Sequence, residues 1–392
     1  MLAPANPVCQ RPVARNSVCR PAGNLAAAAR ISGGGARARA SEKALGTIFG
    51  AFQEACAHPL QFVIMRAWNP PHGISPVFNR YAVHEAHKES RMSVKRFPHW
   101  IRRSWPSGAP AEEMKALLGG LKLHTVCQSA HCPNQAECWG RRTATLMILG
   151  NTCTRHCTFC AVNTGHPAPP DPEEPAHVAE AVARLGLRHV VVTSVTRDDL
   201  PDGGADHFAR TVEAIKTRLP ETTVEVLTPD FYAEPAPIRR VLDSGAEVFG
   251  HNIETVARLH PRMRDRRFTY ALSLEALSVA AAGAGAGQYI KSAFMLGCGE
   301  TDAEIQTTLA DLLQAGANVV SLGQYLRPSA KHHAVDQYVS PEKFQSYERM
   351  AYDMGFTFAV AGPFVRSSYR SEELLEHTAV RTPTGNGEKT AG

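Results

Sequence analysis

Six cysteines between Cys127 and Cys160 form two triplets with different spacings. The second triplet, Cys153, Cys157 and Cys160, has the spacing C-x3-C-x2-C. Three thiolates on one short loop suit a 4Fe–4S cluster whose fourth iron has no cysteine ligand. Because such an iron can bind a cofactor or a substrate, this triplet predicts a reactive centre.

The first triplet, Cys127, Cys132 and Cys138, has the spacing C-x4-C-x5-C and also supplies three ligands. A structural zinc site would usually have four ligands in paired spacings, and no second C-x2-C pair is present in the sequence. A ferredoxin would offer four cysteines for each cluster. A chain long enough to bury a core does not need disulfides for stability, so we interpret both triplets as iron ligands in a reducing compartment.

Composition restricts the class of protein. The chain has 392 residues, of which 44% are hydrophobic and 20% charged, as is typical of a globular protein. The net charge of +5 comes from residues 1–91, which carry 11 Lys/Arg and 4 Asp/Glu. The remainder is close to neutral, so the total predicts no face that binds nucleic acid. No apolar run is long enough to predict a transmembrane helix.

The sequence suggests four segments. Residues 1–91 are expected to be a disordered or non-native extension, and Met92 is a plausible natural start. Their first forty residues contain six Arg and no Asp or Glu, a composition that also resembles an organellar transit peptide. Because we favour a disordered or non-native extension over a transit peptide, we expect a bacterial cytoplasmic location, with a mitochondrial or plastid matrix as the alternative. Residues 92–140 are expected to hold the first triplet, 141–375 a catalytic domain, and 376–392 a disordered tail.

Residues 141–375 alternate between short β-branched runs and segments with helical spacing. The expected strands are 145–149, 189–193, 223–227, 247–252, 289–295 and 318–322, and the expected helices include 176–185, 206–218, 238–244 and 303–315. Fully apolar strands alternating with helices predict a parallel sheet covered by helices. The expected fold class is α/β, a partial (β/α)6 TIM-like barrel with N- and C-terminal extensions; a doubly wound open sheet is the alternative.

Polar residues and the second triplet follow several of these strands. The triplet begins four residues after the first strand, while Thr193-Ser194 and Thr228-Pro229 lie at or just beyond the ends of later strands. In barrels of this type, the chemistry lies at the carboxyl ends of the strands. The sequence therefore predicts that these residues meet at one mouth of the barrel.

The C-x3-C-x2-C loop, with Phe159 before its last cysteine, resembles the radical S-adenosylmethionine superfamily. In that superfamily the open iron binds the amino and carboxylate groups of S-adenosylmethionine. An electron from the cluster then cleaves this cofactor to methionine and a 5′-deoxyadenosyl radical. Such a cofactor is needed to break an unactivated C–H bond, because side-chain acids and bases cannot do so.

The first triplet narrows the resemblance, since residues 127–139 are similar to the auxiliary-cluster motif of the lipoyl synthase family. Further segments match that family in order over roughly residues 95–375, at 192–204, 227–231, 251–255, 323–329 and 362–369. The resemblance implies insertion of two sulfur atoms, at C6 and C8 of a protein-bound octanoyl chain. It further implies that an auxiliary 4Fe–4S cluster is the sulfur donor and that Ser368, in Arg-Ser-Ser-Tyr, is its fourth ligand.

The resemblance also suggests cofactor contacts and partners. Lys291 and Gly297 are expected at strand ends near S-adenosylmethionine, and Asn252 and Glu254 are candidates for polar contacts, although Glu254 could instead cap a helix. Arg366 could guide the substrate or pair with a carboxylate. The expected partners are octanoylated lipoyl-carrier domains of 2-oxoacid dehydrogenase complexes and of the glycine cleavage H protein, and an electron donor such as ferredoxin or flavodoxin. No membrane or nucleic acid is expected.

Some positions differ from the family pattern, namely Gln128-Ser129, Thr196, Phe294 and Cys298, but none of them is an expected ligand. A relative of biotin synthase or of the methylthiotransferases would be the alternative radical enzyme. The C-x4-C-x5-C triplet and Ser368 argue against it. A pure electron-transfer protein would need eight cluster ligands and no barrel.

Overall fold

An eight-stranded sheet carries the cysteine loops. The computed structural model describes residues 97–102, 109–140, 145–369 and 371–374. The expectations for residues 1–91 and 376–392 lie outside these ranges. The sheet consists of β1 (His124–Thr125), β2 (Thr145–Ile148), β5 (His189–Ser194), β6 (Thr223–Leu227), β7 (Val248–Gly250), β8 (Tyr289–Leu296), β9 (Val319–Gln324) and β10 (Phe358–Gly362).

The order of the strands in the sheet follows the order in the chain, β1-β2-β5-β6-β7-β8-β9-β10. Every pair is parallel except β1 with β2, where His124 lies opposite Met147. A doubly wound sheet would reverse direction at a switch point, so the partial barrel is confirmed and the open alternative is wrong. All six expected strands form, and β10 adds a further parallel strand that the sequence did not predict.

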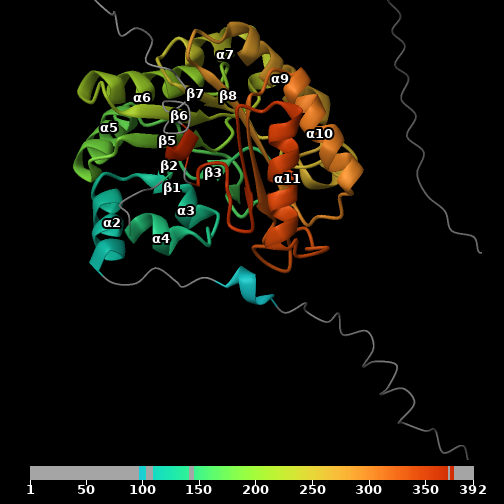
Figure 1. Cartoon of the computed structure of the whole chain (residues 1–392). Helices are drawn as coiled ribbons and strands as arrows, with labels where there is room; N and C mark the ends of the chain where they lie inside the picture. Colours follow the sequence, from blue (N-terminus) through green and yellow to red (C-terminus); the bar gives the residue numbers. More distant parts are fainter. Residues whose placement is uncertain (1–96, 103–108, 141–144, 370, 375–392) are drawn as a thin grey trace, which may run out of the picture. The chain divides into compact units, whose positions relative to one another are not determined.

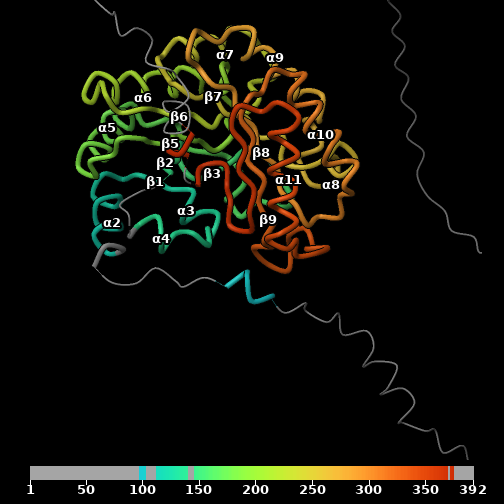
Figure 2. The backbone as a smooth tube through the Cα atoms, in the orientation of Figure 1, coloured from blue at the N-terminus to red at the C-terminus, as the bar shows by residue number. Residues whose placement is uncertain are grey.

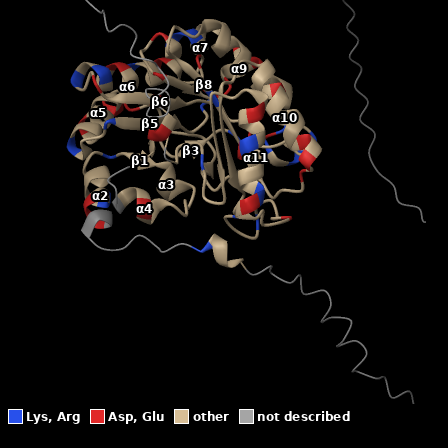
Figure 3. Cartoon of the chain, in the orientation of Figure 1, with Lys and Arg blue, Asp and Glu red and all other residues tan. Residues whose placement is uncertain are grey.

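Helices cover the outside of the sheet (Figure 1). The helices that follow strands of the sheet are α5 (Glu174–Leu185), α6 (Ala205–Arg218), α7 (Pro235–Leu242), α8 (His260–Met263), α9 (Tyr270–Gly283), α10 (Asp302–Gln314) and α11 (Pro341–Met354). These helices carry many Lys, Arg, Asp and Glu residues, for example α6, α10 and α11 (Figure 3). No helix in the described ranges is both long and apolar enough to cross a membrane.

Shorter elements surround the cysteines. Before the barrel come η1 (His99–Ile101), α2 (Ala109–Gly120), α3 (Val126–Ser129) and α4 (Gln135–Gly140). The small strands β3 (Thr152–Cys153) and β4 (Asn163–Thr164) pair with each other and flank the loop of the second triplet, and η2 (Phe231–Ala233) follows β6. The first triplet therefore lies on α3, α4 and the turn between them (Figure 2).

The amino-terminal end of the barrel is closed by polar and apolar contacts. Lys291 of β8 donates to both carboxylate oxygens of Glu225 of β6, at 2.9 and 2.8 Å, and both side chains are buried. Leu374 packs with Val248, Val319 and Phe358. The chain after β10 thus reaches the amino-terminal ends of the strands at Leu374.

Candidate active site

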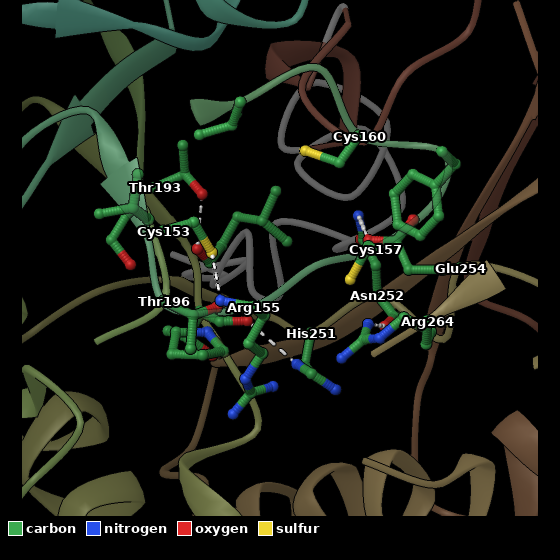
Figure 4. A pocket seen from close by; sticks show the side chains of 17 residues that line it. Cys153, Arg155, Cys157, Cys160, Thr193, Thr196, His251, Asn252, Glu254 and Arg264 are labelled. Atoms are coloured by element: carbon green, nitrogen blue, oxygen red, sulfur yellow. Dashed lines mark hydrogen bonds between the residues drawn. The ribbon is translucent and has the colours of Figure 1, made fainter. Parts of the chain in front are cut away.

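The second triplet lines a cavity at the carboxyl ends of the strands. Cys153, Cys157 and Cys160 border a space of about 170 Å³ together with residues at the end of β5 and residues that follow β6 and β7 (Figure 4). Those residues include Thr193, Ser194, Thr228, Pro229, His251, Asn252 and Glu254. The expected convergence on one mouth is confirmed.

A second cavity, of about 320 Å³, joins the two triplets. It shares Cys160, Asn252 and Glu254 with the first cavity and also contacts Cys127 and Cys132. A third space of about 30 Å³ is lined by all of Cys127, Cys132 and Cys138 together with Ser368. The structure therefore brings each triplet together, and it brings Ser368 to the first one.

Arg155, within the second triplet, is turned inward and is only 4% exposed. Its guanidinium donates to Asp198, with Nη2 at 2.8 Å from Oδ1, and to both oxygens of Asp230. It also lies 3.2 Å from the centre of the Phe268 ring. Asp198 and Asp230 follow β5 and β6, so this ion-pair network anchors the cysteine loop to two strand ends of the barrel.

The other side of the same loop is held by backbone contacts. The amide of His156 donates to Asp265 at 3.0 Å, and the amide of Thr158 donates to the carbonyl of Met263 at 2.8 Å. The amide of His333 in turn donates to the carbonyl of Thr158 at 2.9 Å. The side chain of His156 is 69% exposed, in contrast to that of Arg155. The loop is thus fixed between several elements of the barrel.

Ser368 reaches the first triplet through the chain that follows β10. Thr145 Oγ1 donates to Ser368 Oγ at 2.8 Å although the two residues are 223 positions apart. Asn134 Nδ2 donates to the carbonyl of Phe364 at 2.7 Å, and the hydroxyl of Tyr369 donates to Glu137 at 2.9 Å. These hydrogen bonds tie residues 364–369, the serine segment, to the part of the chain that carries Cys132 and Cys138.

Gly323 of β9 allows this segment to lie inside the barrel. A Cβ atom at Gly323 would stand 2.0 Å from the carbonyl oxygen of Val365. No side chain fits at that distance, so the residue type follows from the close approach of the serine segment.

Glu254 is placed in the cavity by an unusual backbone conformation. Its φ of +68° is in the left-handed region, and its amide and carbonyl bond to Ala293 and Met295 at 3.0 and 2.9 Å. Strained backbone of this kind is concentrated at functional sites. Asn252 Nδ2 donates to Glu254 Oε1 at 3.2 Å. The N-cap of the next helix, α8, is Leu259, so Glu254 does not cap it.

Two further expected cofactor contacts lie elsewhere. Lys291 forms the buried ion pair with Glu225 and lines neither large cavity. Gly297 has a φ of +95°, and a Cβ atom there would stand 2.2 Å from Gln324 Nε2. Gly297 serves a tight turn in which its amide donates to Glu300 at 2.5 Å. The contacts of both residues give no support to cofactor binding, and that role stays a prediction.

The thiols are partly or fully buried, and this affects their ionisation. Burial raises the pKa of Cys127 to about 11 and that of Cys160 to about 12, and it also raises the pKa of Cys157. A bound iron replaces the proton and stabilises the thiolate at neutral pH. Two pockets with three thiols each therefore suit iron–sulfur clusters better than free thiolates.

The three thiols of each triplet do not form a site for a single metal ion. Within the described ranges, no three side chains of His, Cys, Asp or Glu are close enough together to hold one metal ion. In a 4Fe–4S cluster each thiolate binds a different iron, so the ligands of a cluster stand further apart than those of a single ion. Three thiols line the pocket of each triplet.

Sequence reasoning gave no role to several residues that shape the first cavity. His251 is buried, and its Nδ1 lies 3.0 Å from the carbonyl of Thr228, which makes Nδ1 the protonated nitrogen. Burial lowers its pKa to about 4, so the ring is neutral. Arg155 is a second such residue, since the sequence assigned it no part in the site. The only signal for its anchoring role was that Asp198 and Asp230 follow neighbouring strands.

Two family models match parts of the chain. A model of the radical SAM superfamily matches residues 147–312, and a model described as the N-terminal domain of lipoyl synthase of the radical SAM family matches residues 77–132. Among solved structures, a crystal structure of methylornithine synthase aligns with a TM-score of 0.44 at 13% identity, covering 71% of this chain and 93% of that one.

Sequence relatives are much closer. The chain is 49% identical over 283 residues to a mitochondrial lipoyl synthase of Oryza sativa subsp. indica, which covers 71% of this chain and 74% of the relative. It is 51% identical over 279 residues to a lipoyl synthase of Thermus thermophilus, covering 71% and 86%. The chain therefore belongs to the lipoyl synthase family of the radical S-adenosylmethionine superfamily.

Proposed function

We propose that this chain inserts two sulfur atoms, at C6 and C8, into an octanoyl chain bound to a carrier protein. The observation that carries this proposal is the cavity of about 320 Å³ that contacts Cys160 at one side and Cys127 and Cys132 at another. A substrate in this cavity would lie between a site that abstracts hydrogen and a site that holds sulfur.

The two clusters have separate ligand sets in this proposal. Cys153, Cys157 and Cys160 hold a 4Fe–4S cluster with one open iron, while Cys127, Cys132, Cys138 and Ser368 hold the auxiliary 4Fe–4S cluster. When bound, the first cluster and S-adenosylmethionine supply the abstraction of hydrogen from unactivated carbon. A serine oxygen is a harder ligand than a thiolate, so Ser368 would leave the soft cluster iron more easily than a cysteine.

The cavity between the triplets suits an aliphatic chain. Much of its lining is apolar, namely Val126, Met147, Val162, Leu227, Met295 and Leu326. An alkyl chain binds in such a place because burial removes its surface from water. Arg366 and Ser367 add polar groups beside Ser368. The residues of the chain thus orient the substrate and exclude water, and the clusters carry the chemistry.

The partner is a lipoyl-carrier protein, because the octanoyl chain is protein-bound. We propose carrier domains of 2-oxoacid dehydrogenase complexes and the glycine cleavage H protein, with ferredoxin or flavodoxin as the electron donor. The plant relatives are mitochondrial lipoyl synthases. A cytoplasmic location in bacteria remains our proposal, with an organelle matrix as the alternative if residues 1–91 are a transit peptide.

Adjacent serines allow a matched test of the sulfur site. Ser368→Ala and Ser367→Ala would be reconstituted anaerobically and given reductant, S-adenosylmethionine and an octanoylated carrier peptide. Ser368→Ala should still form 5′-deoxyadenosine but yield little or no product with added sulfur. Ser367→Ala removes a hydroxyl from the lining of the cavity but no expected ligand, so it should still yield product with added sulfur, although more slowly than the unmodified protein. The readouts are the mass of the peptide and the amount of 5′-deoxyadenosine.

Other outcomes would change the proposal in distinct ways. Normal sulfur insertion by Ser368→Ala would remove Ser368 from the ligand set. Formation of 5′-deoxyadenosine by the unmodified protein without any gain in peptide mass would reject the substrate. A complete lack of 5′-deoxyadenosine would reject the radical chemistry as well.

A further inference from the structure

The loop of the second triplet contacts a strongly basic segment of the chain. Residues 262–267, which overlap the end of α8, contain four arginines and one aspartate. The amide of Thr158 in the cysteine loop donates to the carbonyl of Met263 at 2.8 Å, and Thr158 Oγ1 donates to the carbonyl of Arg262 at 3.0 Å. The basic segment is thus fixed directly beside the cysteines.

The arginines of this basic segment have different surroundings. Arg264 is 8% exposed and lines the first cavity (Figure 4). The side chain of Arg267 is 54% exposed, and its Nε donates to Asp265 at 3.0 Å. Arg262 and Arg266 are exposed, and within the described part of the chain neither side chain has a hydrogen bond or an ion pair. Two cations beside the cysteine loop are therefore available to a partner.

Further exposed side chains adjoin these cations. His156 lies within the triplet, its side chain is 69% exposed, and its Nδ1 is 4.0 Å from Asp265. Tyr232 is 48% exposed with a φ of +54°, and its ring centre lies 5.5 Å from that of Phe268, which directly follows the basic segment. Tyrosine and arginine are enriched at protein interfaces. We call the exposed set the loop face, namely His156, Tyr232, Arg262, Arg266 and Arg267.

The loop face carries a positive charge that the protein as a whole lacks. Its three arginines outnumber Asp265, the one carboxylate of the basic segment, whose pKa is lowered by the hydrogen bond from Arg267. The chain after residue 91 is close to neutral, so this charge is a local feature. A local basic face on a neutral protein attracts an acidic partner and speeds its approach.

The position of the loop face distinguishes between two protein partners. A carrier protein must deliver its octanoyl chain to the cavity of about 320 Å³, and no residue of the loop face lines that cavity. An electron donor must instead approach the loop of the second triplet, because electron transfer slows steeply with distance. His156 and Thr158 of that loop are exposed. The geometry therefore favours the electron donor.

We propose that the loop face docks an acidic electron-transfer protein, which passes one electron to the cluster held by the second triplet. The donor is oxidised by one electron and the cluster is reduced by one, and no bond forms or breaks. Contacts between redox proteins are small and short-lived, so the attraction between opposite charges governs how often they form. This docking role rests on the proposed radical function, because that function requires the electron.

The test measures binding and electron supply separately. Unmodified protein and the double variant Arg262→Glu with Arg266→Glu would be reconstituted anaerobically to equal iron content. Calorimetry would give the Kd of an acidic flavodoxin in its oxidised state. The rate of 5′-deoxyadenosine formation would be followed with limiting reduced flavodoxin and, separately, with dithionite. The matched control is Arg188→Glu with Arg349→Glu, which reverses two exposed arginines directly before β5 and on α11.

At low ionic strength the Arg262 and Arg266 variant should raise the Kd of flavodoxin about 10- to 100-fold, because two attractive charges become repulsive. In about 0.5 M salt the difference should shrink below about 3-fold, because exposed charges are then screened. The rate with flavodoxin should fall in parallel. The rate with dithionite should match that of the unmodified protein, since this small reagent needs no docking surface. The control variant should behave like the unmodified protein throughout.

Unchanged Kd and rate with flavodoxin would overturn the proposal. Equal losses in the control variant would also overturn it, because net charge alone would then be responsible. The same holds for equal losses of rate with dithionite and with flavodoxin, which would indicate damage to the site. Weaker binding of octanoylated glycine cleavage H protein, with normal binding of flavodoxin, would assign the loop face to the carrier instead.

Two further results are separable from these. If the double Glu variant does not retain iron, Arg262→Gln with Arg266→Gln decides the question by the same comparison. If the unmodified protein forms no 5′-deoxyadenosine with dithionite, the radical function is rejected, while the Kd of flavodoxin still tests the docking surface.

Discussion

The loop of the second triplet and the site of the first triplet are assembled over very different lengths of chain. Cys153, Cys157 and Cys160 lie on one short loop, which buried ion pairs from Arg155 fix to the ends of β5 and β6. The other site combines α3, α4 and the start of β2 with Ser368, a serine 223 residues beyond Thr145. Ser368 and its neighbours are held at this site by single hydrogen bonds.

This difference matches the use that we propose for each site. A cluster that works repeatedly needs ligands held in one geometry, and buried bidentate ion pairs provide this. A cluster that gives up its sulfur must lose ligands during turnover, and a serine held by one hydroxyl contact is suited to that. Rigid anchoring is thus found at the site of the second triplet, the radical site, and weaker anchoring at the site of the first triplet, the sulfur site.

Of the variants considered, Cys157→Ala should have the largest effect, which is the loss of the cluster at the radical site. It removes one of only three ligands, so about four irons per chain should be lost. Formation of 5′-deoxyadenosine should fall below detection, while the iron of the auxiliary cluster remains. Iron analysis and electron paramagnetic resonance would measure this. Cys298→Ala is the control, because Cys298 lines neither large cavity. This variant protein should keep all of its iron.

Arg155→Met tests the anchor itself. It leaves Asp198 and Asp230 buried without their main partner, and loss of one member of a buried pair typically costs about 3–5 kcal/mol. Arg264 and Arg267 lie near these carboxylates, at 3.5 and 3.7 Å, and place the expected loss at the lower end. The unfolding free energy and the iron content should both decrease. Equal stability of Arg155→Met and the exposed-site variant His156→Ala would contradict the anchoring role.

Lys291→Met tests whether Lys291 stabilises the amino-terminal end of the barrel or contacts the cofactor in the cavity. It should cost about 3–5 kcal/mol because Glu225 would be left buried and unpaired, and the double variant Lys291→Met with Glu225→Leu should recover most of that loss. In the double variant the Kd of S-adenosylmethionine should stay unchanged, since Lys291 lines neither large cavity. A large rise in that Kd, with normal stability, would return Lys291 to the cofactor site.

Acid should destabilise both regions mildly through buried neutral histidines. Burial lowers the pKa of His251, beneath the radical site, to about 4 and that of His189, which contacts Ser371 near the serine segment, to about 3. The unfolded chain takes up these protons near pH 6.5, so stability falls as pH decreases below 6.5, by up to about 1.4 kcal/mol per pH unit for each histidine.

Thermal unfolding between pH 7.5 and 5.5 would measure this dependence. His189→Gln should reduce the slope of the unfolding free energy against pH by the equivalent of about one proton, because no imidazole at this position then titrates in the unfolded chain. An unchanged slope would show that His189 has the same pKa in the folded and the unfolded protein.

The sequence predicted the strands of the barrel within one or two residues, because fully apolar β-branched runs have few alternative structures in a core. It missed β10, whose Ala359, Ala361 and Gly362 give a weak strand signal. It also passed over α9, where small buried residues such as Ser273, Ala276 and Ala280 let the helix approach its neighbours.

The site was predictable where it is local in the sequence. The C-x3-C-x2-C loop follows from spacing, whereas Ser368 was found only through resemblance, since no local pattern connects it to Cys127. Arg155 and Arg264 were not found, because the direction of a side chain depends on tertiary partners such as Asp230. Lys291 was placed near the cofactor because it lies on β8, but β8 runs through the whole barrel, and Lys291 is near its amino-terminal end.

The most direct test of the division between the two sites is a variant with Cys127, Cys132 and Cys138 all replaced by Ala. After anaerobic reconstitution with S-adenosylmethionine, reductant and octanoylated peptide, 5′-deoxyadenosine and peptide mass would be followed together. We expect 5′-deoxyadenosine to form while no sulfur enters the peptide. Sulfur insertion by this variant, or loss of 5′-deoxyadenosine despite a full cluster at Cys153, Cys157 and Cys160, would contradict the separate roles of the two triplets.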